Sequence, residues 1–201
     1  MALERGIEVV KFFPAEASGG LPLLASMSAP YSGIKFIPTG GINLNNLTSY
    51  LSNKKVHACG GSWMVKDNLI SSGNFNEITR LTKEAVSTML GFEFAHLGIN
   101  EEDEDETLNS ASLLSHLFYF PIKEGNSSVF AGSGFEVIKK RFLGKHGHIA
   151  IATNDIHRAI AYLKMKGISV LPETTKEKDG KLKLVYLDKE ISGFAIHLLQ
   201  K

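Results

Sequence analysis

Lys11 lies in the apolar run from Ile7 to Pro14, a setting in which a lysine can do chemistry. If this run is a strand, alternation places Lys11 on the same face as Ile7 and Val9. Desolvation among apolar side chains disfavours the ammonium form and lowers the pKa of a lysine from about 10.4. A neutral amine can then attack a ketone carbon and form a Schiff base. The alternative is a lysine whose stem packs while its ammonium reaches water.

Two Gly-Gly loops follow the next two apolar runs. The first spans Pro38 to Asn43 and the second spans Cys59 to Trp63. Paired glycines let the backbone approach an anion and turn N–H groups toward it, and a helix capped by Asn43 would add its positive end. One such pair is typical of a plain turn. Two pairs after successive strands, downstream of a strand lysine, indicate a phosphate site that includes the Ser62 hydroxyl.

The elements that must position these residues alternate along the first 90 residues. We expect strands at 7–13, 34–37 and 56–59, and helices at 21–27, 44–51 and 74–89. Strands buried on both faces and separated by helices predict parallel βαβ units. Because Pro14 ends the first strand, Lys11 is expected near the carboxyl end, where β/α barrels carry their active sites.

Three motifs in this region resemble the family of 2-keto-3-deoxy-6-phosphogluconate and 4-hydroxy-2-oxoglutarate aldolases. They are KFFPAEASGG at 11–20, FIPTGGI at 36–42 and GGSWMV at 60–65. The resemblance covers about residues 2–88. It implies a class I lyase of carbohydrate metabolism that cleaves a small phosphorylated keto-acid through a Schiff base, releases pyruvate and needs no cofactor. It also implies an α/β fold, with the last three strands of a (β/α)8 TIM barrel in residues 1–90.

By that resemblance Lys11 is the Schiff-base lysine. The positions that would bind substrate and phosphate are Phe13, Thr39, Gly40, Gly41, Gly61 and Ser62. The family's general-base glutamate, carboxylate-binding arginine and a substrate threonine belong to barrel strands one to five, which have no counterpart here. Glu16 lies in the right loop but not at the position of that base. Because these groups are missing, we expect the aldolase active site to be incomplete in this chain. A Schiff-base lysine without a placed acid/base group loses about 10² to 10⁴ in reaction rate.

The pattern changes near Leu90 and becomes two similar halves, which predict an α+β domain of two βαβββ modules at residues 91–201. In the first half we expect strands at 92–99, 129–131 and 135–139, and a helix at 107–120. In the second half we expect strands at 148–153, near 169, at 182–187 and at 194–199, with a helix from Asp155 to Gly167. The six acids at 101–106 are expected to form a solvated loop beside the positive end of the next helix; a metal role is the alternative.

These two halves resemble the vicinal-oxygen-chelate, or glyoxalase-like, family. Segments 94–99 and 147–152 are similar to the first strands of its modules, and segments 135–138 and 195–198 to the last strands. The family places one metal ligand on each of these strands, which implies the set His96, Glu136, His148 and His197. Such ligands suit zinc, nickel or iron. Because His197 stands where the family has glutamate, the alternative is a non-catalytic domain with hydrogen-bonded histidines.

The composition indicates a cytoplasmic protein. A formal net charge of +1 gives no reason to expect binding to nucleic acid or to a membrane surface. The apolar runs are all shorter than the roughly 18 residues of a membrane span, and the N-terminus lacks a signal-peptide core. Cys59 is the single cysteine, which excludes an internal disulfide and is typical of a reducing compartment.

Three function classes follow. The first is a class I aldolase chain, incomplete in itself, joined to a glyoxalase-like domain. The second is a metal-dependent glyoxalase-like enzyme or small-ligand binding protein with a vestigial aldolase segment. The third is an interaction module in which the partial barrel completes another subunit. We expect an oligomer, either a trimer by the aldolase resemblance or a dimer through the C-terminal domain.

Overall fold

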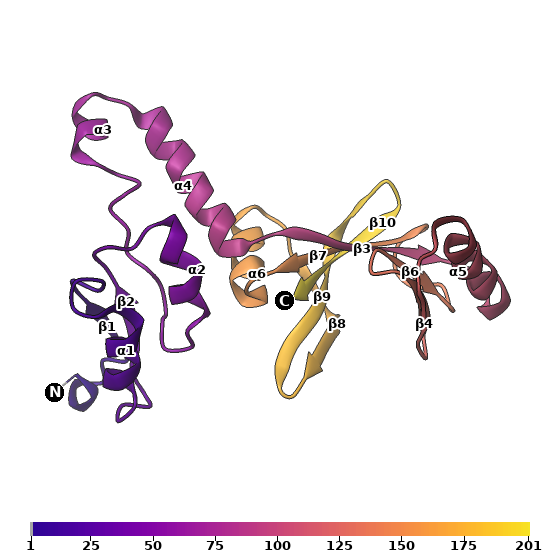
Figure 1. Cartoon of the computed structure of the whole chain (residues 1–201), viewed down its shortest axis with the longest axis horizontal. Coiled ribbons are helices and arrows are strands. Elements are labelled where there is room, and N and C mark those ends of the chain that lie inside the picture. The colour runs from indigo at the N-terminus through magenta and orange to yellow at the C-terminus, as the bar shows by residue number, and fades with distance from the viewer. Residues whose placement is uncertain (1) are drawn as a thin grey trace. The chain divides into compact units, whose positions relative to one another are not determined.

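The computed structural model describes residues 2–201 and divides into two compact units, Met1–Met89 and Leu90–Lys201. Figure 1 shows short strands and helices in the first unit and a sheet in the second. Within the described residues, no helix combines the length and the apolar character needed to cross a bilayer.

The first unit contains two short parallel strands and the helices that follow them. The strands are β1 (Val9–Phe12) and β2 (Lys35–Pro38). The helical elements are η1 (Leu3–Arg5), α1 (Gly20–Ser28), α2 (Leu44–Ser52), α3 (Asp67–Ser71) and α4 (Phe75–Leu90). The predicted strand–helix–strand–helix order is therefore present, and Asn43 caps α2 by accepting a hydrogen bond from the Asn45 amide at 2.9 Å. The sequence pattern did not indicate η1 or α3.

The third strand that the sequence predicts, at 56–59, does not form as a ladder. Isolated parallel bridges join Phe36 to Val56 and Thr39 to Gly60. The segment therefore runs beside β2 without continuous pairing, and among the described residues its other side has no strand. Parallel strands are normally stabilised by neighbours on both sides and by covered faces. The described part of this unit is thus a two-stranded sheet with a third segment alongside it.

One apolar core holds the first unit together. It combines side chains from both strands, from α1 and α2, and from the bridging segment. Its buried members include Phe12, Ala15, Leu24, Phe36, Ile42, Leu47, Tyr50 and Val56. The amphipathic spacing that predicted α1 and α2 thus corresponds to the faces that these helices bury.

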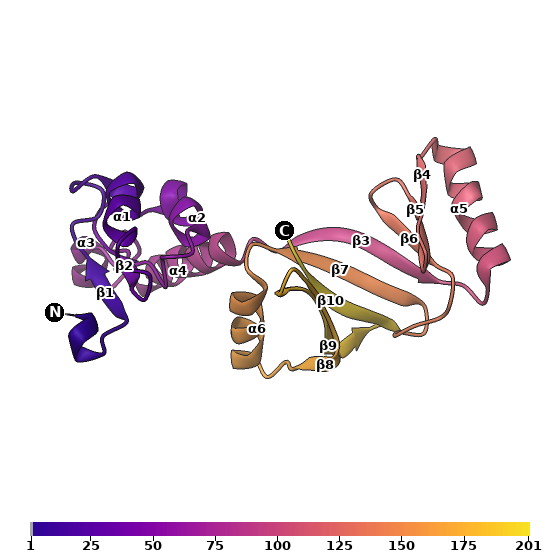
Figure 2. The same ribbon diagram turned by 90° about the horizontal axis from the view of Figure 1, so that it is seen from below.

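The second unit is one eight-stranded sheet made of two βαβββ modules (Figure 2). The first module is β3 (Glu93–Asn100), α5 (Glu104–Phe118), β4 (Ile122–Glu124), β5 (Ser128–Ala131) and β6 (Phe135–Ile138). The second module is β7 (Gly147–Thr153), α6 (Ile156–Met165), β8 (Val170–Lys178), β9 (Lys181–Ile191) and β10 (Phe194–Gln200). The predicted tandem is present, and β4 is the strand that the sequence pattern did not indicate.

The strands of the two modules pair in a similar way, so the sheet contains an approximate structural repeat. The order is β4-β5-β6-β3-β7-β10-β9-β8. In each module the first strand pairs in parallel with the last, β3 with β6 and β7 with β10. The modules join through the antiparallel pair β3–β7 at the centre. Helix α5 packs on β5 and β6, and α6 packs on β9 and β10.

The acidic run at 101–106 is partly loop and partly helix. Asp103 is the N-cap of α5, and its carboxylate accepts a hydrogen bond from the Glu106 amide at 2.9 Å. Glu104, Asp105 and Glu106 occupy the first helical turn, where the helix dipole favours negative charge. The expected loop therefore ends at Asp103, three residues earlier than predicted. Within residues 2–201 the acids of this run do not belong to a cluster that could hold a metal ion.

Candidate metal centre

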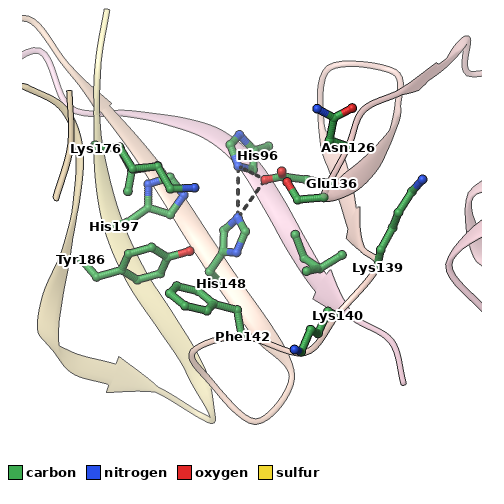
Figure 3. A pocket seen from close by; sticks show the side chains of 13 residues that line it. His96, Asn126, Glu136, Lys139, Lys140, Phe142, His148, Lys176, Tyr186 and His197 are labelled. Carbon is green, nitrogen blue, oxygen red and sulfur yellow. Dashed lines mark hydrogen bonds and ion pairs between the residues drawn. The ribbon is translucent and has the colours of Figure 1, made fainter. Parts of the chain in front are cut away.

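Each of the four central strands of the second unit contributes one side chain to a common cluster (Figure 3). These side chains are His96 on β3, Glu136 on β6, His148 on β7 and His197 on β10. Strand pairing explains why they meet, since Gly98 of β3 lies opposite Glu136 on one side and His148 on the other. On β6 the neighbouring residue, Val137, packs beneath α5 in a buried cluster. Glu136 therefore faces the side of the sheet away from α5.

The donor atoms of this cluster lie at distances expected for ligands around one ion. His96 Nε2 and His148 Nε2 are 3.1 Å apart. Glu136 Oε2 is 3.1 Å from His96 Nε2 and 3.2 Å from His148 Nε2. Because imidazole and carboxylate bind divalent ions at about 2.0 to 2.2 Å, adjacent ligand atoms lie about 3.0 to 3.5 Å apart. Donor atoms of His96, His148 and His197 all fall within 4.8 Å of one another.

Without a cation, these close contacts cannot all be good hydrogen bonds. If His96 Nε2 and His148 Nε2 both donate to Glu136, the two N–H groups also oppose each other across 3.1 Å. If one of these nitrogens accepts from the other, it cannot also donate to the carboxylate. A divalent ion removes the conflict, because all three atoms then direct lone pairs toward it. The chemistry of the donor set therefore fits a bound metal ion.

Burial and hydrogen bonding set the charge of the cluster. Burial by itself would raise the pKa of Glu136, but hydrogen bonds from His148, His96 and Ser128 outweigh it and hold that pKa well below its usual range. Burial, followed by the proximity of His148 and His96, lowers the pKa of His197 to about 3. At neutral pH the cluster thus offers a carboxylate and an uncharged His197 imidazole.

Two further residues position the ligands, and the sequence pattern did not single them out. Ser128 Oγ donates to Glu136 Oε1 at 2.6 Å, which leaves Oε2 directed at the histidines. A Cβ added at Gly98 would overlap the His148 ring, so the ring needs a glycine at that point of β3. The available signal was a glycine in the middle of a predicted strand, which often marks a close approach by another group.

The cluster opens onto a cavity of about 470 Å³. Its apolar walls include Ile138, Phe142 and Leu184. Tyr186 also lines the cavity, and burial, together with the charge of Glu136, raises its pKa. The Tyr186 hydroxyl therefore keeps its proton and can donate a hydrogen bond to a ligand. A cavity of this size, lined mainly by polar and charged side chains with an apolar patch at Ile138, Phe142 and Leu184, suits a small polar organic molecule.

The predicted lysine of the first unit lies near the end of β1 but is not buried. Lys11 is exposed, and its Nζ lies 4.9 Å from the centre of the Phe13 ring, which is itself 64% exposed. The expectation of a desolvated amine is therefore wrong for the chain as the structure describes it. Among the described residues β1 pairs with β2 alone, so no strand at its other edge helps to enclose the lysine.

The loops that the aldolase resemblance singled out do lie at the same end of the small sheet. The Ala15 amide donates to the Thr39 carbonyl at 2.8 Å, and the Glu16 amide donates to the Gly40 carbonyl at 3.1 Å. The Glu16 carboxylate accepts a hydrogen bond from the Tyr50 hydroxyl, which the sequence did not predict. The loop after β1 is thus fastened to the first Gly-Gly loop.

The glycines of these loops are needed for close packing and turning. Gly40 and Gly41 have φ angles of 92° and 83°, which side chains rarely adopt. A Cβ added at Gly61 would overlap the Trp63 ring. Ser62 is exposed beside them. Thr39 forms an isolated bridge with Gly60, and a Cβ added at Gly40 would meet the Phe13 ring. The two Gly-Gly loops therefore lie beside each other, while their use for binding phosphate stays a prediction.

Both units match known protein families. Residues 71–198 match the family model described as Glyoxalase/Bleomycin resistance protein/Dioxygenase superfamily, and this match takes in more than half of the chain. The chain belongs to this superfamily. Residues 1–81 match the family model described as KDPG and KHG aldolase. Both resemblances inferred from the motifs are confirmed, with the aldolase segment preceding the glyoxalase domain.

Curated relatives match the aldolase segment. The 2-dehydro-3-deoxy-phosphogluconate aldolase of Treponema pallidum is 49% identical over 85 residues, which are 42% of this chain and 40% of the relative. The enzyme of the same name from Haemophilus influenzae is 50% identical over 86 residues, or 43% and 41%. The chain therefore spans about 40% of the length of these relatives.

A solved structure is similar to the glyoxalase domain. It is a methylmalonyl-CoA epimerase of Streptomyces coelicolor in complex with 2-nitronate-propionyl-CoA, with 17% identity and a TM-score of 0.41. The similarity covers 54% of this chain and 94% of the epimerase.

Replacement of Gly98 by alanine is expected to weaken zinc binding by about tenfold or more. The new Cβ would displace the His148 ring, and groups that orient ligands typically affect metal affinity by about 10- to 100-fold. Zinc affinity would be measured by competition with a chromophoric chelator. Gly134→Ala is the matched control, since a Cβ there meets nothing within 4 Å. Equal affinities of Gly98→Ala and the unchanged chain would contradict the placement of His148.

The metal-free chain is expected to lose stability as the pH falls below about 6.5. His197 has a pKa of about 3 when folded against 6.5 as its ordinary value, so the unfolded chain binds the proton first. The stability that neutral His197 contributes is present above pH 6.5 and is lost as the pH falls toward 3. The lowered pKa of Glu136 acts in the same direction below its ordinary value of 4.5.

This expectation can be checked by urea unfolding at a series of pH values with a chelator present. His197→Gln should reduce the loss of stability between about pH 6.5 and 4.5, because the group that titrates there is gone. His157→Gln, at an exposed position on α6, is the control. If the free energy of unfolding falls by the same amount in His197→Gln and in the unchanged chain over this pH range, His197 is not the group responsible.

Proposed function

We propose that residues 91–201 form a divalent-metal site for a small oxygen-bearing ligand, as a metal-dependent glyoxalase-like enzyme or ligand-binding domain. The observation that carries the proposal is the convergence of His96, Glu136 and His148 at ligand-to-ligand distances, with a ring nitrogen of His197 within 4.8 Å of those of His96 and His148. Zinc, nickel and iron all accept imidazole and carboxylate ligands. When bound, such an ion supplies a Lewis acid that polarises a carbonyl or hydroxyl oxygen.

The chain's own residues supply binding, orientation and exclusion of water. The Ser128 hydroxyl holds Glu136 so that one oxygen faces the histidines. The protonated Tyr186 hydroxyl can donate to an oxygen of the ligand, and the apolar side chains of Phe142 and Leu184 restrict water. Because Glu136 is the only carboxylate among the described residues that line the cavity, its role as a metal ligand leaves it unavailable as a free base.

The purified chain is expected to carry close to one divalent ion after growth or reconstitution with zinc, nickel or iron. Metal content would be measured by elemental analysis after desalting. His148→Ala should abolish stoichiometric binding, because it removes one of the two nitrogens next to Glu136. The control, His157→Ala, also removes one histidine but at an exposed position of α6, and it should bind the metal ion as the unchanged chain does. If none of the three metals remains bound, the proposed centre is wrong.

We also propose that residues 1–90 retain the nucleophile of a class I aldolase of the keto-acid type. Three observations support this second function: the family match over residues 1–81, the place of Lys11 near the carboxyl end of β1, and the Gly-Gly loops at the same end. The chain spans about 40% of its curated relatives, and the carboxylate of Glu16 is already bonded to Tyr50. Schiff-base formation at Lys11 is therefore proposed, with cleavage slow for want of a placed acid/base group.

Borohydride is expected to trap pyruvate covalently on Lys11. Reduction makes the Schiff base permanent, and mass spectrometry of peptides would locate the added mass. Lys11→Met should remove the adduct. Lys35→Met, at an exposed lysine on the neighbouring strand β2, should leave it unchanged. Labelling that is absent, or spread equally over exposed lysines, would exclude a specific Schiff-base lysine in this chain.

A further inference from the structure

Strand β8 is irregular where it passes the cavity of the glyoxalase domain. Leu171 pairs with Tyr186 of β9, while Lys176 pairs with Leu184. Between these pairs β8 advances five residues and β9 advances only two. Extra residues on one strand bend it and redirect its side chains, and such bulges are frequent beside binding sites.

The side chain of Thr174 holds this bulge in place. Its hydroxyl donates to the Leu171 carbonyl at 2.6 Å and accepts from the Tyr186 amide at 2.9 Å. One hydroxyl thereby closes the extra loop of β8 and ties it to β9. The Tyr186 ring, on the same residue, lines the cavity. The bulge is therefore a fixed part of the cavity wall.

The bulge brings Lys176 to the cavity with its charge unpaired by protein. Figure 3 shows the Lys176 side chain extending toward the histidines, whereas the amino end of Lys139 points away from them. Lys139 is bound by Glu104 at 2.6 Å and by Glu124 at 2.9 Å. Within the part of the chain that the structure describes, no carboxylate oxygen lies within 4.0 Å of Lys176 Nζ. Lys140 also lines the cavity and has no carboxylate partner among the described residues, but Figure 3 shows it farther from the histidines than Lys176. Lys176 is thus the unpaired lysine that extends toward the histidines.

The balance of charge at the cavity favours an anion. One carboxylate ligand and a divalent ion would sum to a charge of about +1, and the lysines Lys176 and Lys140 of the lining add further positive charge. A hydrogen bond from an ammonium to a carboxylate is stronger than one between uncharged groups. The adjoining wall at Phe142 and Leu184 is apolar. The site therefore matches a molecule with an anionic end and a carbon skeleton.

We propose that Lys176 binds the carboxylate of a small organic acid whose further oxygen reaches the donor set of His96, Glu136 and His148. This assignment rests on the proposed metal centre, and it narrows the ligand class from any oxygen-bearing molecule to chelating carboxylates. Lys176 acts as a specificity-determining residue. Thr174 is a positioning residue, because it acts through the path of β8.

The test uses the full chain loaded with cobalt(II), whose visible absorption reports ligands that bind the ion. Two probes would be titrated: oxalate, a chelating dicarboxylate, and imidazole, an uncharged ligand for the same ion. Lys176→Met is expected to weaken oxalate binding by about tenfold or more, as loss of a charge-assisted hydrogen bond would, and to leave imidazole binding unchanged. Lys176→Arg should restore oxalate binding to within a few fold. Lys164→Met, on α6 and outside the cavity lining, is the control.

Thr174→Val removes the hydroxyl at nearly constant size and should weaken oxalate binding in the same direction, with the cobalt spectrum of the ligand-free site preserved. If oxalate affinity is equal in Lys176→Met and the unchanged chain, the assignment of Lys176 is wrong while the metal centre stands. Equal weakening of oxalate and imidazole also overturns it, since Lys176 would then act on the ion site itself. Failure of the chain to take up cobalt overturns the metal centre and this inference together.

Discussion

The candidate site of the second unit requires several polar side-chain atoms to lie close together on one face of a sheet. Each of these buried atoms needs a hydrogen-bond partner or a bound cation. His96, Glu136 and His148 come within 3.2 Å of one another although each belongs to a different strand. The short contact between the two histidine nitrogens cannot be a hydrogen bond while both donate to Glu136, and a cation bound by all three atoms would remove this conflict. The register of the four central strands fixes the cluster, and the glycine at position 98 makes room for it.

Sequence reasoning named the four residues that the structure brings together in the second unit, but not the residues that hold them in place. The four lie in local motifs, whereas their neighbours are set by contacts between distant segments. The four residues lie in short motifs that are similar to the first and last strands of glyoxalase-like modules: His96, Glu136, His148 and His197. Local periodicity located most of the helices and strands. Ser128, Thr174 and Lys176 matter because of strand pairing between distant segments and because of a bulge, neither of which periodicity encodes. The burial of Lys11 was mispredicted for a related reason. An apolar run shows that a strand can be covered, but not that covering strands are present.

The two units also differ in how far each is complete in itself. All four candidate ligands of the glyoxalase domain come from four neighbouring strands of one continuous sheet, in which each module supplies its own parallel pair. The aldolase segment has its lysine and glycine loops on a two-stranded sheet, and the segment beside β2 makes only isolated bridges. Family resemblance is therefore strong in both units, while the local enclosure that chemistry needs is present in the second.

The approximate repeat of the two βαβββ modules has a consequence for how the domain responds to its ion. His96 and Glu136 belong to the first module, and His148 and His197 belong to the second, so neither half holds more than two of the four donors. An ion bound by all four would act as a crosslink between the modules and would stabilise only the state in which both are folded and docked. Cooperativity of unfolding would then depend on metal concentration, with the halves less strongly coupled in the metal-free chain.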